Sequence, residues 1–288
     1  MYGKKICEVD EMSLVHTLLF MLRQEQDMKL AISCLRSLEN STYKTIVVYN
    51  QGNLSNDNLE SFIKSFNLDC HIIGDGTNAG TTVGRQKCFE YIWKNIPDTL
   101  YISELHLDMI FSQNWEDPLV TYLENNEEPL VSCGIVDKKG AMPFLNKNAA
   151  LPEQLSQYDE FLMGLRTDSV VQGFTNPCIH ISEILKKTGG YNAAFLKGRQ
   201  CFEDDSMLLG YYYYYGTKRG WYPKVNYNSV VYHEIAGQRM TAGGKSADNF
   251  DGLVKQYGTM GLKALSELHG SPWHKHYFLT RYQEGMNK

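Results

Sequence analysis

The chain has 288 residues, of which 43% are hydrophobic and 21% are charged, and its formal net charge is -5. This length and composition are typical of a folded globular protein with a substantial core, and the acidic balance argues against nucleic-acid binding, which needs a basic surface. The N-terminal apolar stretch is too short and too interrupted by polar residues to be a signal peptide or a membrane span.

The first half of the chain alternates between strand and helix patterns. Apolar runs predict four strands, at residues 15–22, 45–49, 70–73 and 100–109. Apolar residues with helical spacing lie between them, and Leu59, Phe62, Ile63 and Phe66 are one such set. Alternation with short connections predicts a mostly parallel sheet covered on both faces, which binds its ligands beyond the carboxyl ends of its strands.

Polar residues stand at these strand ends. Asn50, Asp75 and Asp108 each follow an apolar run. In the fourth run, Glu104, His106 and Asp108 occupy alternate positions, so on a continuous strand they would share one face, with Glu104 the deepest of the three. An imidazole and a carboxylate at a strand end suit a divalent cation. A buried hydrogen-bonded pair is the alternative, because such spacing is common by chance.

A glycine-rich loop lies between the third strand and the next predicted helix, over residues 74–86. Such a loop can cradle a phosphate at the helix N-terminus. Arg85 lies one turn into the helix and faces either a diphosphate or solvent. The spacing of the glycines does not fit a dinucleotide or methyl-donor fingerprint.

The second half is less regular. A strand is predicted at 129–136, and residues from about 137 to 172 predict a loop-rich insertion over the site. The tail begins glycine-rich and ends in two helical segments, 250–268 and 273–282. Since no internal repeat or low-complexity linker occurs, nothing requires a second domain.

Three consecutive carboxylates, Glu203, Asp204 and Asp205, open a predicted helix. Acids favour a helix N-terminus through the dipole, so simple capping charge is one interpretation. The flanks are strongly apolar, however, with Phe202 before the acids and a run of apolar residues and five tyrosines after them. Carboxylates buried against such a segment have raised pKa values, as a general base needs, and we favour this functional interpretation.

Two further observations concern single residue types. His233 ends an apolar strand. An isolated histidine at such a position is more often structural than a ligand, so a functional role for His233 depends on the other candidate site residues. The cysteines are odd in number, widely spaced and without a CxxC pair, which is typical of reduced thiols and predicts a cytoplasmic enzyme. They are Cys7, Cys34, Cys70, Cys88, Cys133, Cys178 and Cys201.

Taken in order, these segments resemble a glycosyltransferase with the GT-A fold, and are most similar to the inverting enzymes of glycosyltransferase family 2. "VVYNQGN" stands where that family has a strand ending in Asp-x-Gly-Ser, and "NAGTTVGRQ" resembles its Asn-x-Gly…Ala-Arg-Asn stretch. "LHLDMIFSQNW" stands at its Asp-x-Asp motif, "TGGYNAAF" resembles its Gly-Gly-Phe-Asp turn and "FEDDSM" its Glu-Asp motif, and "VVYHE" resembles the late strand with a metal-binding histidine. The resemblance covers roughly residues 14–240.

The resemblance implies an α/β fold of the GT-A (Rossmann-like) type, with a mostly parallel central sheet flanked by helices and a helical C-terminal tail. It implies a catalytic domain over residues 1–240, with a nucleotide-sugar half at about 14–136 and an acceptor half at about 137–240. Residues 241–288 would form a helical extension packed on the same domain.

The implied reaction moves a sugar from a nucleotide-sugar donor to a glycan, a lipid-linked acceptor or another hydroxyl acceptor, with inversion. Asp204 would be the general base, Asp205 the alternative base, and Glu203 an orienting or acceptor-binding group. Trp221, Tyr222 and Tyr191 would offer faces for sugar stacking, with core packing as the alternative.

The resemblance also implies a divalent metal that neutralises the diphosphate, held by Asp108, His106 and His233. The two imidazoles favour Mn²⁺ over Mg²⁺, and a weakened or absent metal requirement is the alternative. The nucleotide would be lined by Asn50, Asp75, Asn78, Arg85 and His106. Asn50 replaces the family aspartate that pairs with uracil, which leaves other bases open.

Two functions of other classes stay open as alternatives. His106 replaces the first aspartate of the metal motif, which fits a catalytically silent GT-A domain that binds a sugar nucleotide or a partner. The other is a Rossmann-like enzyme that uses the loop at 74–80, such as a methyltransferase, although the glycine spacing is only a weak match. The C-terminal "PWHKHYFLTRY" mixes basic and aromatic residues, so we expect at most peripheral membrane contact, or else a helix docked on the domain.

Overall fold

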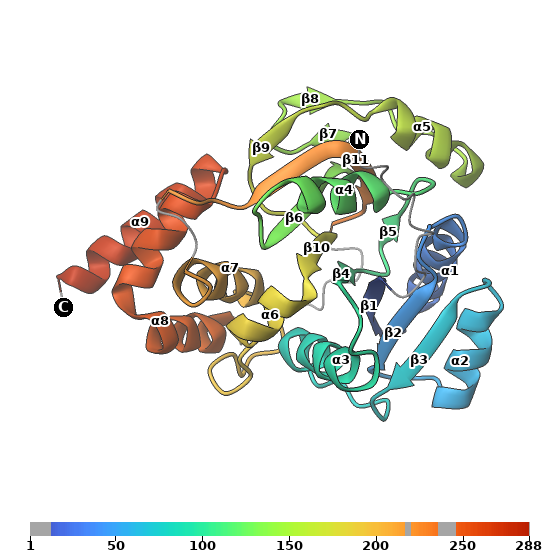
Figure 1. Ribbon diagram of the computed structural model, residues 1–288, viewed down its shortest axis with the longest axis horizontal. Helices are drawn as coiled ribbons and strands as arrows, with labels where there is room; N and C mark the ends of the chain where they lie inside the picture. The colour runs from blue at the N-terminus through green and yellow to red at the C-terminus, as the bar shows by residue number, and fades with distance from the viewer. Residues whose placement is uncertain (1–12, 217–219, 236–245, 288) are drawn as a thin grey trace, which may run out of the picture.

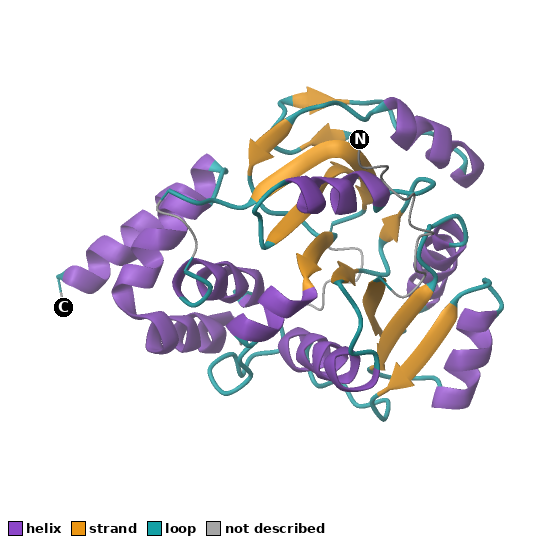
Figure 2. Cartoon of the chain, in the orientation of Figure 1, coloured by secondary structure: helices purple, strands orange, loops and turns teal. Residues whose placement is uncertain are grey.

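The computed structural model describes residues 13–216, 220–235 and 246–287. Within these ranges the chain forms one mixed sheet with helices on both faces, as the sequence predicted (Figures 1 and 2). Cys7 and the first, glycine-rich part of the predicted tail lie outside the described residues.

In the described part of the chain, the sheet has nine strands in the order β3-β2-β1-β4-β10-β6-β11-β5, with β9 paired to β11. Their bounds are β1 (Leu14–Phe20), β2 (Thr45–Asn50), β3 (Asp69–Ile73), β4 (Tyr101–Leu105), β5 (Met109–Ile110), β6 (Leu130–Asp137), β9 (Val170–Gln172), β10 (Cys178–Ile181) and β11 (Lys224–His233). Strands β1, β2, β3, β4, β6 and β11 run in one direction, whereas β5, β9 and β10 run in the other. The sheet is therefore mostly parallel.

The helices of the described residues are α1 (Glu25–Leu38), α2 (Asn56–Lys64), α3 (Thr81–Asn95), α4 (Asp117–Asn125), α5 (Tyr158–Gly164), α6 (Ser182–Thr188), α7 (Glu203–Tyr213), α8 (Ser246–Leu268) and α9 (Pro272–Met286). Helices α1, α2 and α4 share one core with the sheet, and α3 and α6 to α9 share the other. In Figure 1, α8 and α9 form one end of the molecule, and β3 and α2 form the opposite end.

Strand side chains alternate between these two cores. Leu14 and Leu18 of β1 are buried on the side of α1, α2 and α4, whereas Val15 is buried on the other side, with Val47 of β2 and Ile102 of β4. Because both faces of the sheet are covered, the central strands read as continuous apolar runs rather than as an alternating pattern. This is why β1, β2 and β6 were located well from the sequence, whereas no strand was predicted at β10.

The predicted fourth strand was too long. Strand β4 ends at Leu105, and residues 106–108 form a turn. Strand β5 then pairs antiparallel with β11, with Met109 opposite His233. Glu104, His106 and Asp108 therefore do not share a strand face, because the chain leaves β4 to reach the far end of the sheet.

The insertion predicted at about 137–172 contains more regular structure than expected. It holds a hairpin of β7 (Ala141–Met142) and β8 (Lys147–Asn148), a 3₁₀ turn (Leu155–Gln157), α5 and β9. These elements close a small third core over β11.

The two C-terminal helices pack against the body of the fold. Leu253 and Leu265 of α8 and Phe278 of α9 are buried in the same core as Met207 and Tyr211 of α7. In the part of the chain that the structure describes, none of the helices is both long enough and apolar enough to cross a membrane.

Candidate active site

A cavity of about 390 Å³ lies at the carboxyl ends of β1 and β4, the edge at which the parallel sheet was expected to bind its ligand. Its wall combines segments that are far apart in the sequence: the N-terminus of α3, the turn after β4, the end of β11 and the first turn of α7. Eight of the predicted site residues belong to this wall: Asn78, Arg85, His106, Asp108, Glu203, Asp204, Asp205 and His233.

His106, Asp108 and His233 form a compact cluster in this wall. Each offers a ligand atom, and these atoms all lie within 4.8 Å of one another. His233 Nε2 is 3.4 Å from Asp108 Oδ1, and the two imidazole rings meet edge to face with their centroids 5.3 Å apart. The pairing of β5 with β11 brings the turn and the strand end together.

The protonation states of this cluster suit a metal. Burial, followed by the positive charges of Arg85 and His233, lowers the pKa of His106 to about 3. Burial alone would raise the pKa of Asp108, but the hydrogen bond and charge of His233, with a further contribution from His106, lower it to about 2. At neutral pH the cluster thus holds a neutral imidazole and a carboxylate, which are the forms that bind a divalent cation.

The acidic helix enters the wall through a strained turn. Cys201 and Phe202 both have left-handed backbones, with φ values of 87° and 62°. For a residue with a side chain this conformation costs about 1–2 kcal/mol, and such strain is concentrated at functional sites. The turn aims the first residues of α7 at the cavity, where all three acids are part of the wall.

These three carboxylates have different surroundings. Burial and then the charge of Asp204 raise the pKa of Glu203 to about 8. Burial and then the charges of Glu104 and Asp205 raise the pKa of Asp204 to about 7, against a hydrogen bond from Asn176 that lowers it. By accessible surface Glu203 is buried, whereas Asp204 and Asp205 are half-buried, so the burial predicted from the apolar flanks is confirmed for the first acid and only in part for the other two.

Asp205 is held from the C-terminal part of the chain. Its Oδ1 lies 2.7 Å from His269 Nε2, just beyond α8. The His269 ring in turn stacks on His274 and Phe278 of α9. Asp205 is thus paired, whereas Asp204 is the acid with a pKa near neutrality beside the cavity.

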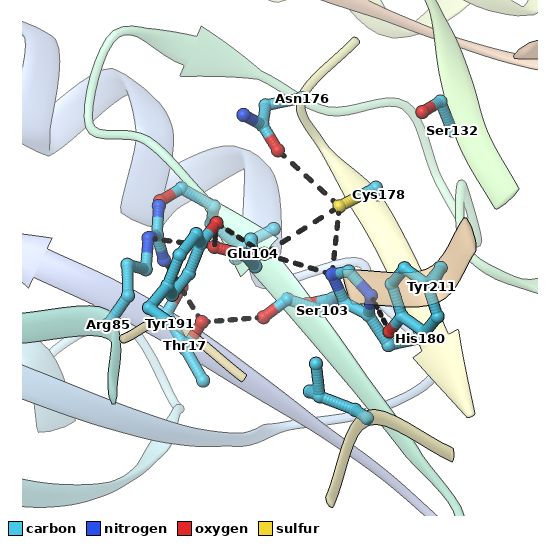
Figure 3. Close-up of polar contacts among 12 residues, drawn as sticks. Thr17, Arg85, Ser103, Glu104, Ser132, Asn176, Cys178, His180, Tyr191 and Tyr211 are labelled. Carbon is cyan, nitrogen blue, oxygen red and sulfur yellow. Dashed lines mark hydrogen bonds and ion pairs between the residues drawn. The ribbon is translucent and has the colours of Figure 1, made fainter. Parts of the chain in front are cut away.

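A buried network supports the floor of the cavity (Figure 3). Glu104 is its centre, as Figure 3 shows: Arg85 Nε lies 3.2 Å from Oε2, His180 Nε2 lies 2.9 Å from Oε1, and the Tyr191 hydroxyl donates to both oxygens. Glu104 is only 1% exposed, which confirms its predicted depth. Arg85 also donates to the main-chain oxygens of Thr17 and Leu105.

This network decides between the two positions expected for Arg85. Its side chain is buried rather than open to solvent, and its guanidinium is engaged by Glu104 and by main-chain oxygens. Its contact with a diphosphate stays a prediction. Glu104, Cys178 and His180 also have metal-ligand spacing, but Arg85 already balances the carboxylate and burial raises the pKa of the Cys178 thiol far above neutrality. The arrangement is that of a structural support.

Asn50 and Asp75 lie outside the cavity wall. The Asn50 amide donates to the main chain of Leu54, and its Oδ1 accepts from Gly52 N, so it closes the turn after β2. Asp75 is exposed and accepts from Thr77 N at 2.9 Å. Their role in nucleotide binding stays a prediction. Asn78 is in the wall, where its Oδ1 accepts from Gly80 N.

The aromatic residues proposed for sugar stacking are separated. Tyr191 is in the wall, but its hydroxyl is engaged by Glu104. Trp221 donates to Glu128, and Lys224 lies over the Tyr222 ring, away from the residues that line the cavity. Trp221 and Tyr222 therefore do not flank this site.

Several residues of the site were missed from the sequence. Asn176, Arg199 and His269 are separated from any recognisable motif, and His180 lies on β10, where no strand was predicted. Arg199 lines the cavity with an exposed side chain. Only the folded chain brings these residues beside the acidic helix.

The sequence matches no protein-family model and no curated protein. The fold, in contrast, is similar to solved structures. Residues 1–349 of S. aureus TarS align with a TM-score of 0.55 at 12% identity, over 94% of this chain and 71% of that one. The same TarS fragment with UDP-GlcNAc gives a TM-score of 0.52 at 11% identity, over 94% and 72% of the two chains. The chain spans 43% of a longer TarS structure.

GalNAc-T7, solved with UDP, GalNAc and Mn²⁺, aligns with a TM-score of 0.53 at 12% identity, over 78% of this chain and 44% of that one. TarS and GalNAc-T7 are glycosyltransferases of the GT-A class. The chain therefore has the GT-A fold, as its motifs predicted. At such identities the likeness establishes the fold alone.

Proposed function

We propose that the protein is an inverting glycosyltransferase that moves a sugar from a nucleoside diphosphate to a hydroxyl acceptor. One observation carries the proposal: on a GT-A fold, the cluster of His106, Asp108 and His233 and the carboxylate Asp204 share one cavity. The nucleotide-sugar donor is supported by the similarly folded TarS and GalNAc-T7, which were solved with UDP-GlcNAc and with UDP.

His106, Asp108 and His233 would hold a divalent metal. Two nitrogen donors and one carboxylate favour Mn²⁺ over Mg²⁺, and GalNAc-T7 was solved with Mn²⁺. Such a metal, when bound, supplies positive charge to a diphosphate leaving group.

Asp204 would act as the general base. It takes the proton from the acceptor hydroxyl as that oxygen attacks the anomeric carbon, while the bond from this carbon to the diphosphate breaks. A single displacement of this kind inverts the configuration. Its pKa of about 7 leaves the side chain ionised just above neutral pH and still basic enough to accept a proton. The paired Asp205 is the weaker candidate.

Nucleotide binding tests the proposal most directly. Thermal unfolding would be followed with UDP, GDP, CDP and ADP, each with and without MnCl₂, because a ligand that binds the folded state raises the unfolding temperature. We expect stabilisation by one or more nucleoside diphosphates, increased by Mn²⁺. The Asp108→Asn variant should lose the Mn²⁺-dependent part, whereas the control Glu183→Gln, on the exposed surface of α6, should keep it.

Two outcomes separate the other functions. Stabilisation by S-adenosylmethionine and by no nucleoside diphosphate would favour the methyltransferase, which the GT-A fold does not support. Binding of a nucleoside diphosphate with no transfer or hydrolysis from a mixture of nucleotide sugars would favour the catalytically silent domain.

A cytoplasmic location and at most peripheral membrane contact are part of the proposal. The described cysteines are free thiols, and all except Cys201 are buried. On α9, Trp273 is 66% exposed, although Phe278 anchors the helix to the core. Release of the protein into the low-salt supernatant after cell lysis would agree with this location. Sedimentation of the protein with membranes would contradict it.

A further inference from the structure

One carboxyl oxygen in the cavity wall lacks a partner. Glu203 Oε2 is fully buried and makes no hydrogen bond, and the residue as a whole is 8% exposed. A buried polar atom left unsatisfied costs about 1–3 kcal/mol, so folded proteins seldom keep one without a purpose. Because Glu203 belongs to the wall of the cavity, a bound molecule is the natural partner of its carboxyl group.

The position of Glu203 indicates which molecule. It is the first residue of α7 and the direct neighbour of Asp204, the proposed base. In the proposed reaction Asp204 takes its proton from the acceptor hydroxyl. A ligand that contacts both Glu203 and Asp204 is therefore the acceptor. The left-handed conformation of Phe202 fixes the direction in which this first helical residue points.

The charges around Glu203 are mainly negative. Asp204 and Asp205 lie on its own helix, and Glu104 on β4 raises its pKa further. Arg85 on α3 is engaged by Glu104, and His269 is engaged by Asp205.

The remaining titratable or charged groups of the wall are Arg199, His106, Asp108, Tyr191, Cys201 and His233. In this setting the carboxyl group, whose pKa is about 8, keeps its proton at neutral pH and can donate it in a hydrogen bond.

We propose that protonated Glu203 donates a hydrogen bond to an oxygen of the acceptor, and that this part of the site selects an uncharged, hydroxyl-bearing acceptor such as a carbohydrate. The inference rests on the proposed function. A phosphate or carboxylate placed here would meet Glu104, Asp204 and Asp205, which like-charge repulsion disfavours. A sugar oxygen, in contrast, satisfies the buried carboxyl group without adding charge.

The test compares Glu203→Gln, which keeps a hydrogen-bond donor, with Glu203→Ala, which removes it. Neutral probes would be the methyl glycosides of glucose, galactose and N-acetylglucosamine. Charged probes would be glucose 6-phosphate and glycerol 3-phosphate. Binding would be measured by saturation-transfer NMR in the presence of Mn²⁺ and the nucleoside diphosphate that stabilises the protein best. Glu183→Gln is the matched control, because it makes the same change in the first turn of α6 on an exposed residue.

We expect a neutral glycoside to bind the wild type, Glu203→Gln and the control with similar affinity, and to bind Glu203→Ala at least about tenfold more weakly, which corresponds to about 1.4 kcal/mol. Above pH 8 the wild type should lose affinity as the carboxyl group ionises, whereas Glu203→Gln should not. Nucleoside diphosphate binding should be the same in all four proteins.

Three results would overturn the inference: equal glycoside binding by Glu203→Ala and the wild type, equal loss with pH in Glu203→Gln, or binding of only the phosphorylated probes or of none. Each of these leaves the proposed function standing as long as the wild type binds a nucleoside diphosphate. If no nucleoside diphosphate binds, the proposed function itself fails.

Discussion

Asp204 and Asp205 are adjacent in the sequence and have the same side chain, but the fold gives them different partners. Asp205 is held by His269 at 2.7 Å, whereas Asp204 receives a hydrogen bond from Asn176 and lies near the negative charge of Glu104. The contact with His269 holds the Asp205 side chain in place, whereas burial and then the charges of Glu104 and Asp205 raise the pKa of Asp204. The assignment of the base follows from this difference.

Replacing each of the two acids in turn should therefore show that only Asp204 acts as the base. Asp204→Asn should lower kcat by about 10²–10⁴, the usual contribution of a general base. Asp205→Asn should lower it by a factor of about ten or less, because that side chain positions rather than accepts a proton. Steady-state transfer assays measure both, and thermal shifts with a nucleoside diphosphate check that donor binding survives. Equal losses in the two variants would contradict the assignment.

The pH dependence of the wild type follows from the same residue. A base must be deprotonated to work, so kcat/KM should fall as pH drops below about 7, the pKa of Asp204. The expected profile is a single acid limb between pH 5 and 7, measured at saturating MnCl₂. A rate that stays constant down to pH 5 would show that the proton goes elsewhere.

At the scale of elements, the N-terminus of α3 and the loop before α7 are fitted closely together. Gly80 has a φ of 84°, and a Cβ built on it would lie 2.9 Å from Cα of Arg199. Thr81 N also donates to the Arg199 carbonyl oxygen. The two halves of the cavity therefore meet at a glycine that no larger residue can replace without displacing the loop.

Gly80→Ala should both destabilise the protein and reduce activity, because the methyl group has no room. Gly189→Ala is the matched control: its φ of 88° imposes the same backbone penalty, but no atom lies within 4 Å of the added Cβ. We expect the control to lose about 1–2 kcal/mol of stability at most with little change in kcat. Denaturant unfolding and a transfer assay on both variants measure the difference, and equal activity in the two would exclude a role for this contact.

The elements also show what sequence reasoning can reach. Parallel strands covered on both faces are visible as apolar runs, so β1, β2 and β6 were placed within a few residues. The end of β4 was missed because Leu107 and Met109 continue its pattern of apolar residues. Its true end is set by the pairing of β5 with β11, which depends on a partner far along the chain.

For the site too, local segments were recognised from the sequence, whereas features that depend on distant partners were not. The motifs identified His106, Asp108, His233 and the acidic helix, because these residues are carried by short segments with recognisable spacing. The supports of the site left no such signal. His180 and Asn176 act only through the tertiary fold. Arg85 was placed on the correct helix and lies in the cavity wall, but its pairing with Glu104 was not predicted.

At the scale of the whole molecule, the C-terminal part of the chain supports one residue of the cavity wall, Asp205. His269 is the link, since it joins the end of α8 to the acidic turn of α7 and stacks between two rings of α9. Its side chain is 12% exposed and that of Asp205 14%, so the pair is largely shielded from solvent.

His269→Ala should lower the unfolding temperature by a few degrees and kcat by about tenfold, because Asp205 loses its partner and the first turn of α7 is less well fixed. Binding of the nucleoside diphosphate should be unaffected, since we propose that it binds at the other half of the cavity, beside α3 and the turn after β4. Calorimetry and separate kcat and KM values test this. A variant that changes KM for the donor alone would indicate a different role.

The origin of this link late in the chain has a consequence for biosynthesis. The ribosome adds residue 269 well after it has made the strands of the sheet, the cluster of His106, Asp108 and His233, and the acidic helix α7. Until then Asp205 has no imidazole beside it, and the nascent protein presents an unfinished catalytic wall. Full activity should therefore emerge only after residue 269 has been added and has reached Asp205.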